Sequence, residues 1–576
     1  MEAPTHQALQ FHAGPARGDA TRYLCAAARL DRHFRNAVIS ELVEHSYRVP
    51  APSPGTDLVR VLHECLRARR DEVWAGLAML LVLLIGFFTV DSVATLFVLA
   101  TVLLLRLFRA RGGSPRAAGV ALADGRTDAV VALTAGPGRR GGWRAVLAVL
   151  ATVVLARWLL LWGYGVSEVF GRRYDSGYES GYGFSLPVYL GMLAVLWLIA
   201  AALGYRVRTV LAGRAGPDAR VGTDSPILKR IYGTLGLQQS GPELLYSDHA
   251  PLIGLGVPQD YLQVNMELIA SAARRAEERE PEPVDAALLY QAISTAVRAL
   301  GGGPDYPWDA LHGLTVTDRV FRPGTRPGET GDWLGRMSGP SADGIPVLTR
   351  PWADALALSG HERLRHCLAV RIGSWQEEVV ATVLVRVTTQ GGMLHLELSP
   401  YVLPPVSEAY HLVDRLGDPD LLSDGAVALG LAGRRLGVEV TGAIAQVGTA
   451  FSSVRRAARI RRRYRQVAGR YAVDRSPRIS VRELAAAQGY QNVFQKNDVD
   501  RFFGTVSQRV FSAVLGELEG RGYSTAAFRS QTEYIINNIN HGGVQVTGGT
   551  VHGHVAGGAQ ARVNLSTPPP RVGSGG

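Results

Sequence analysis

The sequence predicts an α-helical membrane domain with four transmembrane helices, followed by a cytoplasmic α+β domain. Long apolar runs in the first third of the chain predict the membrane domain. Alternating β-prone segments between residues 366 and 398, set among helical patterns, predict the α+β domain. Arginines that flank the apolar runs give the orientation.

The first apolar run extends from Val73 to Phe108 and is interrupted near its middle by Asp91 and Ser92. One helix of that length far exceeds the roughly 30 Å hydrocarbon core of a bilayer, at about 1.5 Å per residue. The polar pair is therefore the expected turn of a helical hairpin, and residues 73–108 form the first two spans.

Two further apolar runs predict a third span at residues 145–163 and a fourth at 186–204, each long enough to cross a bilayer. The segment between them, 164–185, is then an outer loop. Basic residues lie on the opposite side of each crossing: Arg67, Arg69 and Arg70 precede the first span, seven arginines occupy the loop 109–144, and Arg206, Arg208 and Arg214 follow the fourth. The positive-inside rule then predicts a multi-pass protein of the inner (plasma) membrane with both termini in the cytoplasm.

An arginine inside a span is costly, at about 3 kcal/mol near the bilayer centre, and marks a functional candidate. Arg157 of the third span lies about 20 Å from Arg144, near the expected level of Asp91. We therefore expect an intramembrane charge pair between Arg157 and Asp91, with snorkelling of Arg157 as the alternative. A transport pathway through these residues is a further alternative, although no span carries a chain of acidic or histidine residues.

The net charge of +11 comes almost entirely from arginine, since Lys229 and Lys496 are the only lysines. This balance is expected of a membrane protein, so it does not by itself predict a nucleic-acid partner. Cys25, Cys65 and Cys367 lie far apart without CxxC spacing, which argues against a zinc site or a disulfide framework. The first apolar run starts too late in the sequence to be a cleaved signal peptide.

Residues 1–72 are polar and carry two helical patterns. An amphipathic helix is expected between Thr21 and Tyr47, resting on the soluble domain or on the membrane surface. A linker from Val49 to Gly55 separates it from a second short helix that leads into the first span.

The α+β domain is expected to occupy residues 214–538. A strong amphipathic pattern predicts a helix at Pro283 to Leu300, and a short strand is expected at 314–321. Strands at 366–372, 379–389 and 393–398 give the clearest β signal, and Gln390-Gly391-Gly392 supplies the turn of an antiparallel hairpin.

A basic helix is expected near residues 454–470. In a domain held beneath an anionic leaflet, each arginine near the surface adds about 1 kcal/mol of attraction, so we predict docking on anionic lipid head groups. Binding of RNA or DNA is the minority reading, because no recognition fold surrounds the segment. The predicted membrane-surface residues are Arg455, Arg456, Arg459, Arg461, Arg462, Arg463 and Arg465.

No catalytic, metal or cofactor motif is complete. His361 and His366 flank a sequence similar to HExxH, but residues five apart on a helix differ by about 140° and cannot share one metal. The sequence therefore predicts no cofactor and no metal. A membrane-tethered enzyme remains an alternative, and it would require a deep cytoplasmic pocket with ionisable groups close together.

The tail at residues 539–576 consists of short β-prone pieces separated by glycine pairs, a pattern that favours cross-β stacking. It resembles the amyloid-signalling motifs of bacterial receptor and effector proteins, which implies self-assembly or capture of a partner protein carrying a similar segment. An inert flexible tail is the alternative. The residues of the motif are Val544, Gln545, Val546, Gly548, Val551 and Val555.

The segment Ser374 to Pro405 is similar to multispan membrane proteins of unknown function from high-GC bacteria, a resemblance that implies no activity. Taken together, the sequence predicts a membrane protein that acts as a binding or signalling scaffold and contacts the lipid bilayer. The alternatives are a transporter or channel component and a membrane-tethered enzyme.

Overall fold

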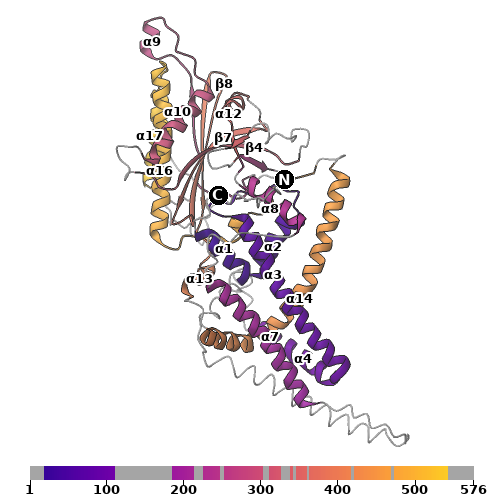
Figure 1. The fold of residues 1–576 in the computed structure, drawn as a ribbon. Coiled ribbons are helices and arrows are strands. Elements are labelled where there is room, and N and C mark those ends of the chain that lie inside the picture. The colour runs from indigo at the N-terminus through magenta and orange to yellow at the C-terminus, as the bar shows by residue number, and fades with distance from the viewer. Residues whose placement is uncertain are drawn as a thin grey trace, which may run out of the picture.

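The computed structural model shows an elongated molecule with an apolar helical bundle at one end and an α+β region at the other (Figure 1). The predicted third span with Arg157 and the predicted tail motif from Val544 to Val555 lie outside the described residues. The structure describes residues 19–110, 185–212, 225–239, 241–246, 252–302, 310–325, 338–340, 346–359, 362–416, 421–468 and 473–541.

The N-terminal region is a small helical body rather than one amphipathic helix. It contains α1 (Asp19–Leu30), α2 (Arg32–Ile39) and a π-helical turn at Ser40–Glu44. The Asp31 carboxylate accepts hydrogen bonds from the backbone amides of His33 and Phe34, which ends α1 and starts α2. Apolar side chains of α1 and α2 pack with those of the first part of α3 and of α8 (Pro226–Gln238).

The apolar bundle begins with α3 (Leu58–Ile85), a single helix that joins the expected cytoplasmic helix to the first expected span. A π-helical turn at Gly86–Val90 follows, and α4 (Ser92–Ala110) returns. The chain reverses at Asp91, whose carboxylate accepts hydrogen bonds from the amides of Ala94 and Ser185, both at 2.9 Å. Asp91 therefore joins the start of α4 to the start of α7 (Leu186–Ala212).

Two described helices are long and apolar enough to cross a bilayer, Leu58–Phe88 and Leu186–Ala212. Only 33% of each apolar window is buried inside the structure, whereas the core helix of a soluble protein is mostly buried. The apolar part of α4 is shorter, at Ser92–Leu107. Among the described residues the structure thus supports two candidate spans; the predicted third span lies outside these residues, so the four-span arrangement stays a prediction.

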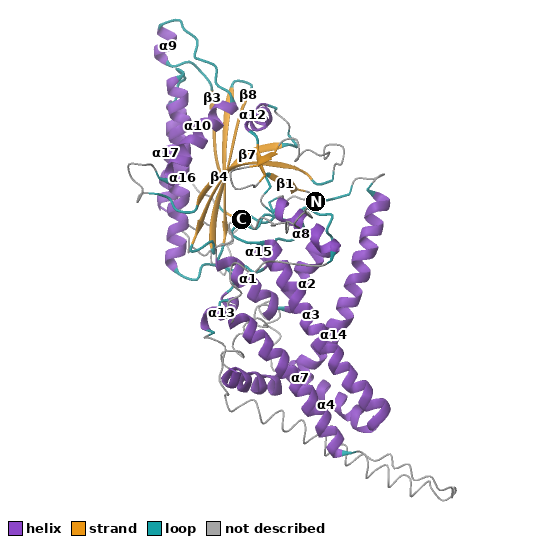
Figure 2. Cartoon of the chain, in the orientation of Figure 1, coloured by secondary structure: helices purple, strands orange, loops and turns teal. Residues whose placement is uncertain are grey.

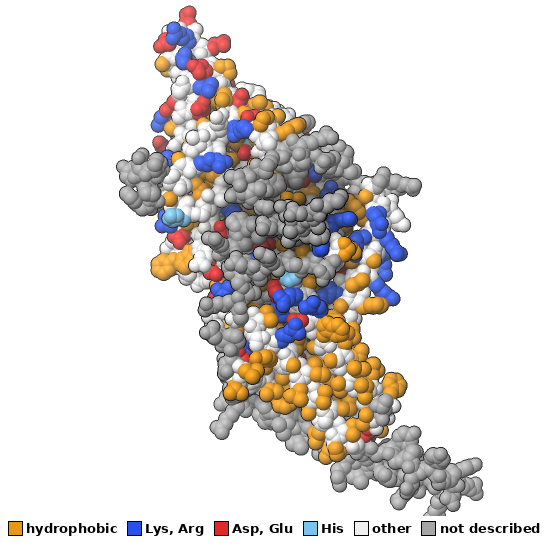
Figure 3. Space-filling model, viewed as in Figure 1, with side chains coloured by type: hydrophobic (Ala, Val, Ile, Leu, Met, Phe, Trp, Pro, Cys, Tyr) orange, Lys and Arg blue, Asp and Glu red, His pale blue; other side chains and the backbone are white. Residues whose placement is uncertain are grey.

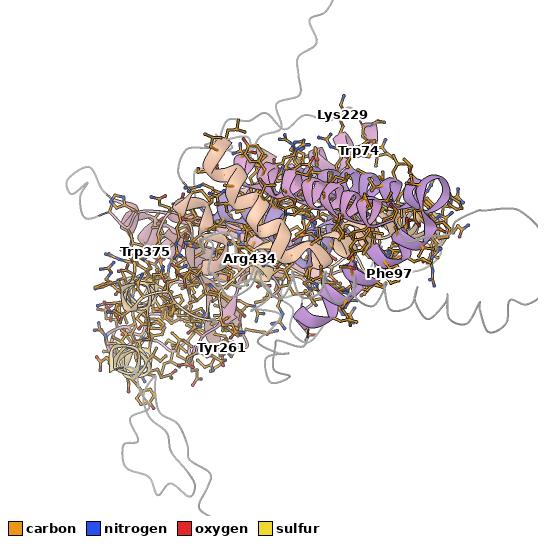
Figure 4. The ribbon with its side chains drawn as sticks, turned by 90° about the horizontal axis from the view of Figure 1, so that it is seen from below. Trp74, Phe97, Lys229, Tyr261, Trp375 and Arg434 are labelled. Carbon is orange, nitrogen blue, oxygen red and sulfur yellow. The ribbon has the colours of Figure 1, made fainter. Side chains whose placement is uncertain are left out.

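The longest described helix, α14 (Leu421–Val467), is about 70 Å long at about 1.5 Å per residue, and its first half crosses this bundle. Small residues on its buried face let it approach closely: Gly437 lies against the backbone of Val102 and Arg106 of α4. The indole of Trp197 in α7 donates a hydrogen bond to the Leu429 carbonyl at 2.9 Å. Figure 4 shows α14, with Arg434, beside the helices that carry Trp74 and Phe97. The sequence-based boundaries assign this helix to the α+β domain, but its first half packs in the bundle.

The α+β region is built on a seven-stranded sheet of order β1-β4-β7-β8-β9, with β2 and β3 both paired to β9 (Figure 2). All pairs are antiparallel except β1 with β4. The predicted hairpin turn is confirmed, with positive φ at Gly391 and Gly392. The strands are β1 (Glu243–Tyr246), β2 (Val257–Pro258), β3 (Leu262–Glu267), β4 (Leu314–Pro323), β7 (Arg365–Ser374), β8 (Val379–Gln390) and β9 (Met393–Leu403).

One face of this sheet packs on α10 (Ala286–Arg298) and α16 (Val493–Gly520). The strands β3 and β9 therefore bury alternate residues, whereas most of β7 and β8 is buried on both faces. The N-cap of α10 is Asp285, as its sequence position suggests. The α+β prediction is therefore confirmed. The remaining elements are α9 (Ala272–Ala276), a 3₁₀ turn at Ala299–Gly301, β5 (Ser338–Pro340), β6 (Pro346–Leu348), α12 (Arg350–Leu358), a 3₁₀ turn at Glu408–Tyr410, α13 (Leu412–Arg415), α15 (Val481–Leu484) and α17 (Ala526–His541).

The close approach of α14 to α4 predicts opposite effects for the same substitution at two glycines of one helix. Alanine is about 1 kcal/mol better than glycine in a helix, so Gly430→Ala, where nothing lies within 4 Å, should raise the unfolding temperature. In Gly437→Ala the new methyl group would lie 2.6 Å from a backbone oxygen. Such overpacking costs about 1–3 kcal/mol, so this substitution should lower the unfolding temperature. Thermal unfolding in detergent tests this contrast, and equal shifts would contradict it.

Candidate functional site

A buried ionic junction lies where the N-terminal helices meet the base of the apolar bundle. Arg29 of α1, with a side chain 2% exposed, donates hydrogen bonds to Glu64 from Nε at 3.1 Å and from Nη2 at 3.0 Å. Its Nη1 donates to Asp71 at 3.1 Å. One guanidinium therefore holds two carboxylates of α3, in the forked geometry that arginine provides.

Two further arginines, both from α2, hold the next carboxylate of α3. Arg32 and Arg35 both donate to Glu72 of α3, Arg32 at 2.9 Å. Arg32 also donates to Glu439 of α14 at 2.9 Å, and Arg35 donates to the Ala28 carbonyl at 3.0 Å. Burial lowers the pKa of the Arg35 guanidinium, and the Glu72 carboxylate opposes that shift.

The junction extends to α7, which brings all the helices of the bundle base except α4 into one network. Arg206 lies 3.2 Å from Asp71, and Arg208 donates to Asp424 of α14 at 2.6 Å. Taking charges out of water costs several kcal/mol per ion unless each finds a partner. Here the number of arginines equals the number of carboxylates that they contact. The arginines are Arg29, Arg32, Arg35 and Arg206, and the carboxylates are Glu64, Asp71, Glu72 and Glu439.

Sequence reasoning missed this junction because it treated the charges of residues 1–72 as solvated or as flanks of a span. The usable signal is the arginines of α1 and α2, which lie in helical segments that are otherwise rich in apolar residues. Three carboxylates, Glu64, Asp71 and Glu72, also occur in the part of α3 that precedes Val73. Opposite charges on two amphipathic helical segments that precede an apolar run indicate paired rather than solvated groups.

Beyond the junction, the bundle exposes a continuous apolar surface, which Figure 3 shows at the lower end of the molecule with arginine and lysine side chains above it. Large side chains on this surface include Trp74 (66% exposed), Phe88 (75%) and Leu103 (52%). A basic collar borders it, formed by exposed Arg67 and Arg70 of α3, Arg106 of α4 and Arg206 of α7.

A second cluster of ionisable groups joins the sheet to α1. Glu378, at the start of β8, lies 3.6 Å from the His411 imidazole. The Tyr23 hydroxyl donates to Asp414 at 2.7 Å, and its ring stacks on His411 with centroids 3.9 Å apart. Arg482, fully buried on α15, donates to the carbonyls of Glu378 and Pro404.

Burial dominates the electrostatics of this second cluster. It raises the pKa of the Glu378 carboxyl to about 7; Arg482 opposes this, and the nearby Asp19 carboxylate adds to it. Burial also lowers the pKa of the His411 imidazole. It raises the pKa of the Tyr23 hydroxyl, in the same direction as the hydrogen bond to Asp414. Neutral forms of all three groups are thus favoured between the sheet and the helices.

The turn before Glu378 is strained. Trp375, Gln376 and Glu377 all have positive φ, at 52°, 55° and 68°. Each such residue costs about 1–2 kcal/mol, so the surrounding contacts must hold the turn. The Gln376 carbonyl accepts a hydrogen bond from the Asp19 amide at 3.1 Å, and the Trp375 indole donates to Asp498 of α16 at 3.2 Å.

The predicted site residues fall in three places. The arginines from Arg455 to Arg465 lie on the last third of α14, beyond the bundle. Both carboxylate oxygens of Asp91 bind helix-start amides, and its expected partner Arg157 lies outside the described residues, as does the tail motif. The intramembrane pair, head-group docking and tail assembly therefore stay predictions.

Within the described residues, no group of three or more His, Cys, Asp or Glu side chains is placed to hold a metal ion. A small pocket on the sheet face opposite α10 is lined by residues with apolar side chains: Pro50, Pro52, Leu244, Leu245, Leu252, Ile253, Leu255, Phe321 and Pro477.

A sequence model of the family described as an AbeC-like domain matches residues 262–552. The match starts at β3 and includes all of α14 together with the sheet from β3 to β9. It also contains Ser374 to Pro405, the segment that resembles uncharacterised bacterial proteins. No curated protein and no solved structure matches the chain.

The junction predicts a large loss of stability when one of its charges is left alone. In Glu72→Leu, Arg35 keeps only a backbone carbonyl as partner, and we expect a loss of about 3–5 kcal/mol. Adding Arg35→Met should recover most of it, because the buried charge is then gone. The control Glu408→Leu breaks an exposed pair with Arg415 and should cost under about 1 kcal/mol. Denaturant unfolding in detergent measures all three, and a double variant as unstable as Glu72→Leu would contradict the prediction.

The raised pKa of Glu378 predicts a specific pH dependence. A carboxyl whose pKa is higher in the folded than in the unfolded state stabilises the fold at low pH, and this stability is lost as pH rises from about 4.5 to about 7. Glu378→Gln should therefore reduce the fall in unfolding temperature between pH 5 and pH 8. The control Glu408→Gln, at a side chain 78% exposed, should leave the fall unchanged. If the Glu378→Gln variant gave a profile parallel to that of the unmodified chain, Glu378 would not titrate in this range.

Proposed function

The chain belongs to the family with an AbeC-like domain, and we propose that it serves as a membrane-anchored binding or signalling scaffold. In this proposal the apolar bundle anchors the chain in the lipid bilayer. The α+β region and the tail then stand at a fixed position on the cytoplasmic face, where they capture partners.

The exposed apolar surface of α3, α4 and α7 carries this proposal. Soluble proteins seldom expose a contiguous apolar patch larger than a few hundred Å². Here large aliphatic and aromatic side chains are exposed along all three helices, including Leu81 (57% exposed), Leu107 (57%) and Leu198 (54%). The basic collar at one end suits the anionic head groups of a cytoplasmic leaflet.

The arrangement of the helix ends supports the four-span topology. Asp91 holds the start of α7 at the far end of the bundle, while α4 ends at Ala110 on the side of the collar. A crossing by residues 145–163 would return the chain to the far end, as the sequence predicts. The collar, the N-terminal helices and the sheet all lie on one side, and the positive-inside rule assigns that side to the cytoplasm.

The tight coupling between the two parts favours a scaffold. Junction contacts from α1 and α2 reach α3 and α14, and α3 in turn pairs with α7 through Asp71 and Arg206. The helix α14 continues from the bundle towards the sheet. Such a frame fixes the height of the α+β region above the bilayer. The tail from residue 542 follows α17, which packs on β3 through Gln531 and Asn265, so a motif there would be presented at the outer edge of the sheet. The alternatives, a transporter or channel component and a membrane-tethered enzyme, gain no specific support from the described residues.

Membrane insertion can be tested with one charged substitution on the apolar surface. The unmodified chain should stay in the membrane pellet at alkaline pH, and reporters fused to either terminus should be active only in the cytoplasm. Leu81→Arg places a charge near the middle of the apolar stretch 73–90, at a cost of about 3 kcal/mol, and should lower the inserted fraction at least tenfold. The control Leu358→Arg, at an exposed leucine of α12, should leave insertion unchanged.

Recovery of the unmodified chain in the detergent-free soluble fraction would contradict the anchor. Activity of a C-terminal reporter only outside the cytoplasm would contradict the proposed topology, even if the anchor is correct.

A further inference from the structure

The helix α14 leaves the apolar bundle at the level of the basic collar. Arg69 lies in the part of α3 that carries the collar, and it donates hydrogen bonds to the Thr449 carbonyl at 3.2 Å and to the Ser453 hydroxyl at 3.1 Å. The apolar run of α3 begins at Val73, about one helical turn after Arg69. These contacts place this part of α14 at the bilayer boundary of the proposed anchor.

Two large apolar side chains are exposed on this part of α14. Phe451 is 61% exposed and Val454 is 67% exposed, and they lie about 60° apart around the helix. Ser453 and Ala457 mark the buried face, which packs on α3 and on the turn at Ser40–Glu44. Exposed apolar groups at the depth of lipid head groups are typical of helices that lie in the membrane interface.

A row of arginines continues this exposed face beyond the collar. Arg456 is not part of it, because it pairs with Glu44 at 3.0 Å. Arg461 is half-buried, and its Nε donates to the Ala457 carbonyl at 3.1 Å. Among the described residues, no carboxylate pairs with the other arginines of the row. We call the exposed set the outer face of α14; it consists of Phe451, Val454, Arg455, Arg459, Arg462, Arg463 and Arg465, all within about one half of the helix circumference.

The inclination of α14 keeps these arginines close to the bilayer. Figure 1 shows the last part of α14 inclined to α3 and α7, the helices that cross the bilayer in the proposed anchor, and Figure 3 shows basic side chains along that edge of the molecule. From Arg455 to Arg465 the helix is about 15 Å long, and an inclined helix rises from the bilayer by less than its length. Head groups extend about 5–8 Å beyond the hydrocarbon core, and charges act over about 8 Å more at physiological salt. The arginines therefore lie within reach of lipid head groups.

The order of side chains along the outer face repeats the order along the bundle. In both, apolar side chains are followed by arginines, as the apolar surface is followed by the collar. A protein interface has its apolar core at the centre and its charges around the rim, whereas here the apolar pair lies at one end. A soluble polyanion would leave Phe451 and Val454 in water at the bilayer edge. A lipid surface covers both kinds of side chain.

We propose that the outer face of α14 lies on the anionic cytoplasmic leaflet, with Phe451 and Val454 in the head-group boundary and its arginines on lipid phosphates. Arginine suits the second contact because its guanidinium pairs with phosphate oxygens through two hydrogen bonds. The inference rests on the proposed membrane anchor, and it adds an apolar contact to the docking that the arginine pattern predicts. Since Tyr464 stacks on Tyr47 with centroids 4.7 Å apart, the docked helix also fixes the tilt of the N-terminal body on the bilayer.

The test uses the full chain in nanodiscs of neutral phosphatidylcholine, or of phosphatidylcholine mixed with anionic phosphatidylglycerol. Val454→Cys introduces a thiol whose rate of reaction with a bulky, water-soluble maleimide reports its access from water. The matched control is Val493→Cys, at a valine 61% exposed on α16 of the α+β region. The unmodified chain gives the background from Cys25, Cys65 and Cys367, of which the last two are buried.

The thiol of Val454→Cys should react at least tenfold more slowly in anionic than in neutral nanodiscs, because docking removes it from water. Salt at about 1 M should remove most of this protection, since it shortens the screening length to about 3 Å. The thiol of Val493→Cys should react at the same rate in both lipids.

The contribution of the arginines is tested in the Val454→Cys chain. Each arginine near an anionic surface favours the docked state by about fivefold, so removal of four should return the reaction to the rate in neutral lipid. Thermal unfolding should not change, because the substituted side chains are exposed. The test variant combines Arg455→Gln, Arg459→Gln, Arg462→Gln and Arg463→Gln. The control variant, which should keep the protection, combines Arg275→Gln, Arg279→Gln, Arg501→Gln and Arg509→Gln.

Equal reaction rates in the two lipids, or protection that survives the loss of the four arginines, would overturn the docking and leave the anchor intact. Stronger protection by poly-glutamate or by a DNA duplex, added to neutral nanodiscs, than by anionic lipid would assign the outer face to a soluble polyanion instead. A chain that enters neither kind of nanodisc would contradict the anchor itself, and the docking with it.

Discussion

The fold depends on the buried pairing of arginines from α1 and α2 with carboxylates of α3. These charges lie where the apolar bundle meets the polar N-terminal body. They are buried there, so neither water nor lipid can solvate them. Pairing satisfies them within the protein: Arg29 alone bonds two carboxylates and is almost fully enclosed. Ion pairs of this kind specify geometry more than they add stability, because a shifted register would leave several buried charges without partners. The junction thereby fixes how the N-terminal body sits on the bundle.

The helix α14 makes the two halves of the chain one structure. Its small residues pack on α4 and α7, Glu439 enters the junction, and its last third stands beside the N-terminal body. The matched family region, 262–552, includes α14, whereas the bundle helices α3, α4 and α7 precede that region. The family domain therefore contributes a helix whose packing partners lie outside the matched region.

The strained turn at Trp375 to Glu377 and the cluster around Glu378 form the second connection between the two parts. Three successive residues with positive φ persist because α1, α15 and α16 each bond to this stretch. A carboxyl that titrates near neutral pH lies at the same point. A short segment thus joins the sheet to the helical body. Hydrogen bonds from three helices hold its backbone, and its Glu378 carboxyl has a pKa near neutral.

The sequence by itself determined the local features: the apolar helices with a reversal at Asp91, the helix that begins near Pro283, and the β7 to β9 strands with a glycine turn. Each follows from periodicity or from the conformational preference of a few neighbouring residues. Only the tertiary structure decided that α14 leaves the α+β region to cross the bundle, and that Arg29 meets Glu64 and Asp71. Those outcomes rest on contacts between residues far apart in the chain, where burial and charge balance outweigh local pattern. A local sequence pattern does not specify which distant element a helix will pack against.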